Sequence, residues 1–199
     1  MELIFATHNP NKIKEIRQLL PKHIRLISLN DINCTRSIPE TADTLKGNAK
    51  LKADFITTTY NKPCFADDTG LLVNSLNGAP GVFSARYAGP KNDANANMDK
   101  LLQNLEGKKD RTACFQTVIA LNIKGETIFF EGEVQGEIIK EKKGGKGFGY
   151  DPIFKPKGFN GTFAELPLET KNKIGHRGKA FSKLIDYLGR VTPQEKKES

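Results

Sequence analysis

A long stretch of β-branched and aromatic residues, from Thr112 to Ile139, is the feature that most limits how this chain folds. Such residues favour extended backbone, and the Lys124-Gly125 pair within the stretch is typical of a tight hairpin turn. Gly132 gives a second turn signal. The stretch therefore predicts antiparallel strands joined by hairpins, and the fold must contain a sheet.

The first part of the chain has a different pattern, in which strand-like and helix-like segments alternate. Residues 3–6 form an apolar run that predicts a buried strand, followed by a polar loop and a helix. A second helix is expected over about 43–60, and it leads into a strand at 64–66. Two more helices are expected, one that stops at Gly107 and one over about 179–188 that ends at Gly189. Helices mixed with strands in this way indicate an α/β fold.

The bulk composition limits the class of protein. The chain has 199 residues, 37% of them hydrophobic, which is enough for a core in one domain or in two lobes that share a sheet. We expect a single domain over 1–189 and a charged, frayed tail over 190–199. The formal charge of +8 favours anionic partners but does not choose between nucleic acid, a membrane surface and small phosphates.

The cysteines and the amino-terminal residues indicate the cell compartment in which the protein is expected. Cys34, Cys64 and Cys114 are widely spaced and contain no Cys-x-x-Cys pair, so neither a disulfide framework nor a thiolate metal site is indicated. The apolar run at residues 3–6 is too short for the core of a signal peptide, and no later run approaches a membrane span. We expect a soluble, cytoplasmic protein.

Two adjacent carboxylates, Asp67 and Asp68, follow the strand expected at 64–66. They would then lie at the carboxyl end of a strand, where α/β sheets usually bind ligands. Adjacent carboxylates repel each other unless they are solvated, point apart or share a cation such as magnesium. Glu40, in a polar loop, is a third acidic candidate. The alternative is a turn in which one Asp caps the backbone before Gly70, with Glu40 stabilised by a helix dipole.

Three further segments have the chemistry of a nucleotide site. The loop at 7–12 joins a strand to a helix start, where backbone N–H groups favour phosphate and Lys12 adds charge; the alternative is a turn capped by Asn9 or Asn11. The glycine-rich segment 143–152 carries an aromatic ring and Asp151. The basic segment 171–179 carries donors. For the glycine-rich segment the alternative is a flexible hairpin loop with Phe148 packed in the core. For the basic segment it is a structural His176, which is the commoner role of a lone His.

Several motifs in one order resemble the inosine/xanthosine triphosphate pyrophosphatase family. They are Thr7-His8-Asn9-Pro10-Asn11-Lys12, Glu40-Thr41, Ala66-Asp67-Asp68-Thr69-Gly70-Leu71, Gly78-Ala79-Pro80-Gly81 with Ser84-Ala85-Arg86-Tyr87, Gly147-Phe148-Gly149-Tyr150-Asp151-Pro152, and Gly175-His176-Arg177-Gly178. The resemblance covers nearly the whole chain. Family members commonly have Ser in place of Thr69 and Gly in place of His8.

The resemblance implies an elongated mixed β-sheet flanked by helices, with two lobes around a central nucleotide-binding cleft. It also implies a homodimer and a magnesium-dependent hydrolase that converts non-standard purine nucleoside triphosphates (ITP, dITP, XTP) to the monophosphate and pyrophosphate. Asp68 would be the catalytic base. Magnesium would be held by Asp68, Glu40 and Asp67. Substrate would be bound by Thr7, His8, Asn9, Pro10, Asn11, Lys12, Thr69, Phe148, Gly149, Tyr150, Asp151, Lys171, His176 and Arg177, with Lys171 on phosphate and His176 and Arg177 on the base.

The sequence is also compatible with two other functions. A related pyrophosphatase for modified pyrimidine triphosphates would use similar groups. A non-enzymatic nucleotide or RNA binder would use the basic and aromatic residues but would have no need of Asp67 and Asp68. The resemblance favours a small nucleoside triphosphate as the partner, without nucleic acid or membrane.

Overall fold

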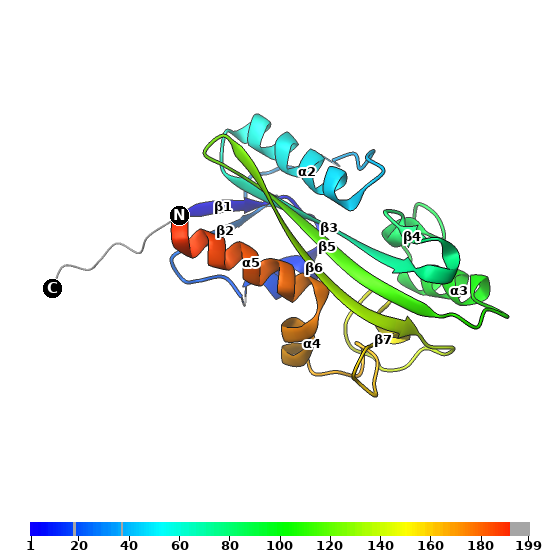
Figure 1. The fold of residues 1–199 in the computed structure, drawn as a ribbon. Coiled ribbons are helices and arrows are strands. Elements are labelled where there is room, and N and C mark those ends of the chain that lie inside the picture. Colours follow the sequence, from blue (N-terminus) through cyan, green and yellow to red (C-terminus); the bar gives the residue numbers. More distant parts are fainter. Residues whose placement is uncertain (18, 37, 192–199) are drawn as a thin grey trace. The chain divides into compact units, whose positions relative to one another are not determined.

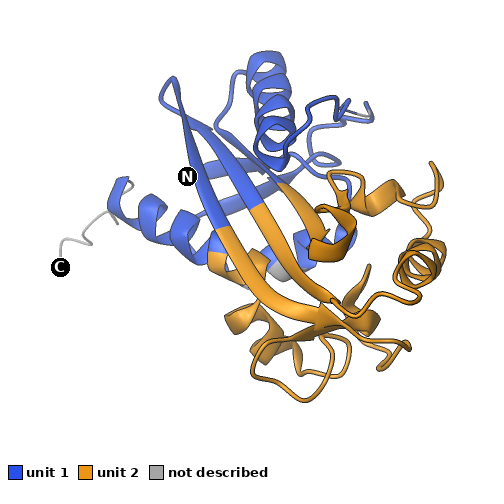
Figure 2. Cartoon of the chain, turned by 45° about the vertical axis from the view of Figure 1, so that its right-hand side comes forward, with its two compact units in different colours: residues 1–67, 118–131, 180–199 blue, residues 68–117, 132–179 orange. Residues whose placement is uncertain are grey.

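The computed structural model describes residues 1–191 except 18 and 37. These residues fall into two compact units. Unit 1 comprises residues 1–67, 118–131 and those from 180 onward, and unit 2 comprises 68–117 and 132–179 (Figure 2). The prediction of a frayed tail concerns 190–199, of which 192–199 lie outside the described residues.

The sheet in the described residues is mixed, as predicted. It has seven strands in the order β2-β1-β3-β5-β6-β7, with β4 paired to β3. In unit 1, β1 (Glu2–Phe5) pairs in parallel with both β2 (Arg25–Ser28) and the start of β3 (Cys64–Val73). In unit 2, β4 (Pro80–Gly81) and β7 (Phe154–Pro156) pair antiparallel with β3 and β6 (Glu126–Ile138).

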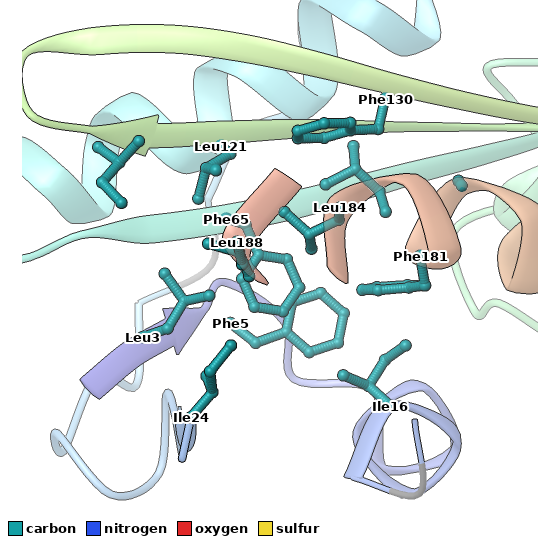
Figure 3. Packing of buried hydrophobic residues seen from close by; sticks show 13 residues of the cluster. Leu3, Phe5, Ile16, Ile24, Phe65, Leu121, Phe130, Phe181, Leu184 and Leu188 are labelled. Carbon is teal, nitrogen blue, oxygen red and sulfur yellow. The ribbon is translucent and has the colours of Figure 1, made fainter. Parts of the chain in front are cut away.

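Helices cover both faces of the sheet in unit 1 (Figure 1). Successive strand residues point to opposite faces, so Leu3 and Phe5 of β1 face away from Ile4. Leu3 and Phe5 pack with α5 (His176–Val191) in one cluster, where Phe5 stacks on Phe65 with ring centroids 4.4 Å apart (Figure 3). Ile4 packs in a second cluster with the apolar face of α2 (Leu45–Tyr60).

Unit 2 has its own core. It is built on the later part of β3, β5 (Thr112–Ile123), β6 and the helix α3 (Ala94–Asn104). Leu71, Leu101, Ile153 and Phe154 are fully buried there. The short helix α4 (Leu168–Ile174) follows, and the remaining helix, α1 (Pro10–Arg17), belongs to unit 1.

The long hairpin is confirmed, whereas three boundaries were predicted wrongly. Lys124 and Gly125 both have positive φ, 52° and 82°, as the tight turn between β5 and β6 requires. Gly132 is not a turn, because β6 continues through it as an extended strand. The last helix does not end at Gly189: it begins at His176 and continues to Val191, and Gly189 lacks the positive φ of a helix-ending glycine.

The third correction concerns the acidic pair. β3 does not end at Ala66 but runs on to Val73, so Asp67 and Asp68 lie inside the strand. As successive strand residues, their side chains point to opposite faces, which separates the two charges. The turn alternative is therefore also wrong.

None of the helices within the described residues has the length and apolar character needed to cross a bilayer.

Candidate active site

The loop after β1 is held by its own side chains. Thr7 Oγ1 accepts a hydrogen bond from the Asn9 N–H at 3.2 Å. Asn9 Oδ1 accepts from the N–H groups of Asn11 and Lys12 at 2.9 and 3.4 Å, so Asn9 caps α1 as the alternative interpretation predicted. His8 is exposed, and its Nε2 lies 3.1 Å from the Arg36 carbonyl oxygen, which must accept. A phosphate at this loop would compete with the Asn9 cap.

Lys12 extends from this loop to Asp67. Its Nζ lies 2.9 Å from Oδ1 and 2.8 Å from Oδ2 of Asp67, whose side chain has no exposed surface. A buried carboxylate requires such a partner, because burial strongly disfavours an isolated charge. Both residues belong to unit 1, so the first helix and the acidic strand are joined there by charge.

Glu40 is also paired with a lysine. Lys52 Nζ lies 2.5 Å from Glu40 Oε1, and the side chains are 10% and 27% exposed. Lys52 lies one turn after Asn48 on the buried face of α2, and Asn48 Oδ1 accepts from the Ala42 N–H at 2.9 Å. α2 itself begins with Thr44 as its cap. The loop that carries Glu40 is thereby fixed to α2 at two points.

Asp68 and Thr69 begin unit 2. Asp68 is buried, with 8% of its surface exposed. Thr69 Oγ1 lies 2.7 Å from Oγ1 of Thr117 in β5, and Thr117 is fully buried. The Thr69 hydroxyl is therefore oriented by a neighbouring strand.

The acidic residues fit magnesium in chemistry but do not form a ready-made cluster. No group of three or more His, Cys, Asp or Glu side chains suited to a metal is found among residues 1–191, with 18 and 37 left aside. Asp67 and Glu40 instead lie against lysines. Carboxylate oxygens are the donors that Mg²⁺ prefers, and this ion commonly uses one or two carboxylates together with substrate phosphates and waters.

A second group of predicted residues surrounds the ring of Phe148 in unit 2. Lys171 Nζ lies 4.8 Å and Arg177 Cζ 5.1 Å from the ring centroid, within the range of cation–π attraction. Lys171 Nζ also lies 2.7 Å from Asp151 Oδ2. The ring is only partly buried. This is an aromatic surface bordered by two cations, suited to a planar, electron-rich group.

His176 and Tyr150 lie deeper in the same unit. The His176 ring stacks on Phe115 with centroids 4.6 Å apart and 16° between the planes. Burial raises the pKa of Tyr150, which keeps the phenol protonated, and its hydroxyl donates to the Ser84 carbonyl at 2.8 Å. Gly149, between Phe148 and Tyr150 in the chain, has a φ of +65°, a conformation that glycine adopts without strain.

Sequence reasoning missed Lys52, Thr117 and Phe115. Lys52 had a usable signal, because it repeats at helical spacing with Asn48 and Ile56 on the apolar face of α2, where a charge is unusual. Thr117 and Phe115 stand in a strand rich in similar residues and acquire their roles only through distant partners, Thr69 and His176. No local pattern marks them.

The chain matches proteins of known family over almost its full length. The Ham1 family model matches residues 3–187. A dITP/XTP pyrophosphatase of Christiangramia forsetii is 58% identical over 190 residues, covering 96% of this chain and 100% of the relative. Another, from Flavobacterium johnsoniae, is 60% identical over 188 residues, covering 94% and 98%. The Ham1 protein of Staphylococcus aureus has a similar fold, with a TM-score of 0.89, 38% identity and coverage of 96% and 100%.

These matches confirm the family resemblance found in the sequence motifs. A family match over residues 3–187 and identities near 60% leave no doubt about descent. The chain belongs to the Ham1 family.

Proposed function

We propose that this protein hydrolyses dITP, ITP and XTP to the nucleoside monophosphate and pyrophosphate, and so removes these nucleotides from the cell's pool. The observation that carries the proposal is the pair of residue groups just described: carboxylates paired with lysines in unit 1, and an aromatic ring bordered by cations in unit 2. The first group is suited to a triphosphate and the second to a purine base. The relatives named dITP/XTP pyrophosphatase support it.

Asp68 acts as the general base in this proposal. Its carboxylate accepts a proton from a water molecule, which attacks a phosphorus atom while pyrophosphate leaves. A positioned base of this kind contributes about 10²- to 10⁴-fold to the rate. Thr69, whose hydroxyl is oriented by Thr117, would contact the substrate.

Lys12, on the loop at 7–12, stabilises the charge of the phosphates. A phosphate bound at this loop would accept from backbone N–H groups that Asn9 otherwise caps. His8 is hydrogen-bonded to the Arg36 carbonyl and keeps the loop close to the segment that contains Arg36. Asp68 would hold Mg²⁺, and Glu40 would contribute a further carboxylate. Asp67 points to the opposite face of β3 and both of its oxygens lie against Lys12, so the direct metal role expected for Asp67 from the sequence is replaced here by that of holding Lys12. When bound, the ion supplies charge neutralisation on the triphosphate.

The base is proposed to lie on Phe148. Arg177 and His176 donate hydrogen bonds to the 6-keto oxygen of hypoxanthine or xanthine, whereas the 6-amino group of adenine would present a donor to donors. The contacts of Lys171 with Asp151 and the Phe148 ring support a place beside the base, so the phosphate role expected for Lys171 from the sequence is replaced here. Tyr150, whose hydroxyl is engaged by Ser84, would contribute through its backbone.

We also propose a homodimer in the cytoplasm, as the family resemblance implies.

A substrate panel distinguishes the proposed function from the alternative, a pyrophosphatase for modified pyrimidine triphosphates. We expect ITP, dITP and XTP to be cleaved far faster than pyrimidine triphosphates or ATP. A preference for pyrimidines would overturn the proposal. Binding to RNA that weakens steeply with salt, without hydrolysis, would indicate the non-enzymatic alternative.

A further inference from the structure

One carboxylate oxygen holds two parts of the proposed base site. Asp151 Oδ2 accepts from Lys171 Nζ at 2.7 Å and from the Phe148 N–H at 2.8 Å. The Asp151 N–H in turn lies 3.3 Å from the Phe148 carbonyl oxygen. We refer to Gly147, Phe148, Asp151 and Lys171 together as the Asp151 cluster. A purine on Phe148 would meet a ring and an ammonium group whose positions both depend on Asp151.

Stability alone does not account for this buried ion pair. Asp151 is 3% and Lys171 7% exposed. The desolvation cost of such a pair often equals or exceeds its Coulombic gain, so well-packed apolar residues would commonly serve the fold as well. Burial raises the pKa of Asp151, and the Lys171 ammonium opposes that shift. The pair is better explained by what it holds in place.

The turn before Phe148 is shaped around the same oxygen. Gly147 has a φ of +78°, and a Cβ atom built on it would lie 2.1 Å from Asp151 Oδ2. No side chain fits at that distance. Gly145, two residues earlier in the same loop, has nothing within 4 Å of such a Cβ and no positive φ, so it offers a control for the addition of a methyl group to this loop.

We propose that Asp151 is a positioning residue for base selection: its carboxylate fixes the Lys171 ammonium and the Phe148 backbone, and through them the orientation in which the purine binds. This role differs from the one expected from the sequence, in which Asp151 accepts a hydrogen bond from the base. Oδ2 is already used by two donors within the protein. The inference rests on the proposed function.

The test compares four single variants with the parent protein. Asp151→Asn keeps the shape of the side chain but weakens its hold on Lys171, and Gly147→Ala keeps both charges but crowds the same oxygen. Gly145→Ala is the control for the loop. Asp99→Asn is the control for the charge, because Asp99 also pairs with a lysine of unit 2, Lys142, but at an exposed position. The readouts are kcat and KM for ITP, XTP, GTP and ATP, with thermal unfolding to confirm folding.

We expect Asp151→Asn and Gly147→Ala to reduce the ratio of kcat/KM for ITP over ATP by roughly tenfold, the change that losing one hydrogen bond to a charged group typically brings. KM for ITP should rise more than kcat falls. The two controls should keep the parent ratio within about twofold, as surface changes usually do. Lys171→Met combined with Asp151→Asn should reduce the ratio by less than the two single changes together, because both changes remove the Asp151–Lys171 contact.

The inference is overturned if Gly147→Ala keeps the parent ratio, or if Asp151→Asn lowers kcat/KM for all four nucleotides by one factor. Gly147→Ala decides the matter if Asp151→Asn does not fold. A parent protein that cleaves none of the purine triphosphates contradicts the proposed function instead, and so separates the two failures.

Discussion

Lys12 Nζ lies within 3 Å of both carboxylate oxygens of Asp67, at 2.9 and 2.8 Å, although the two residues are 55 positions apart in the chain. This contact explains how a strand can contain two consecutive aspartates. One carboxylate is neutralised on its own face by a lysine from the first helix, while Asp68 points to the other face. The two neighbours are therefore suited to different tasks, and their substitutions should have different effects.

Replacing Lys12 by Met should destabilise the protein by about 2 kcal/mol, because it leaves the buried Asp67 carboxylate without this partner. Urea unfolding of Lys12→Met, Asp67→Asn and the double variant gives the coupling energy between the two sites. The double variant should recover part of the loss. Strictly additive effects would show that the pair contributes nothing as a pair.

Asp68→Asn should remove most turnover while leaving stability nearly unchanged. The amide has almost the same shape but cannot accept a proton, and a loss of about 10²- to 10⁴-fold in kcat is typical for a general base. Steady-state kinetics with ITP, together with a thermal unfolding curve, measure both effects. Near-parent turnover in a folded Asp68→Asn protein would remove Asp68 from the mechanism.

Thr69→Ser should be nearly neutral, whereas Thr69→Val should lower activity. Serine keeps the hydroxyl that lies 2.7 Å from Thr117 Oγ1, and valine leaves the buried Thr117 hydroxyl without that contact at a cost of about 1–3 kcal/mol. The comparison uses kcat/KM for ITP and the free energy of unfolding of both variants. If valine and serine behave alike, the Thr69 hydroxyl has no role.

Arg177→Ala should lose activity on ITP and XTP more than on ATP. Losing a donor to a buried keto oxygen typically costs about 1–3 kcal/mol, or roughly one to two orders of magnitude in preference. A suitable control is Arg190→Ala, since Arg190 is exposed near the end of α5. An equal loss on ITP, XTP and ATP would mean that Arg177 does not distinguish between the bases.

Local signals gave most of the secondary structure. The Lys124-Gly125 turn could be predicted because the left-handed backbone it needs suits few residue types. The start of α2 could be predicted to within two residues from the helical spacing of its apolar residues, and the structure shows Thr44 as its cap. The end of β3 could not, because two aspartates and a glycine usually indicate a turn, and only the distant Lys12 makes Asp67 acceptable within a strand.

The candidate site was predictable where the motifs spell it out and not where it depends on packing. The motifs contain Phe148 and Arg177, and the basic segment contains Lys171, but neither shows that Asp151 holds Lys171 against the ring. Likewise, Glu40 was named while its partner Lys52 was not. These pairings join residues 12 to 20 positions apart through the tertiary fold. A single sequence therefore indicates the side chains with functional chemistry better than the side chains that position them.

The most direct test of the proposed function identifies the products formed from ITP. The nucleotide is analysed by chromatography, and pyrophosphate and phosphate are measured in a separate assay. The reaction is run with Mg²⁺ and after removal of the metal with EDTA, using Asp68→Asn as the inactive control. We expect IMP and pyrophosphate in equal amounts, formed only with Mg²⁺. Formation of IDP and phosphate, or undiminished release of pyrophosphate after EDTA treatment, would contradict the proposed function.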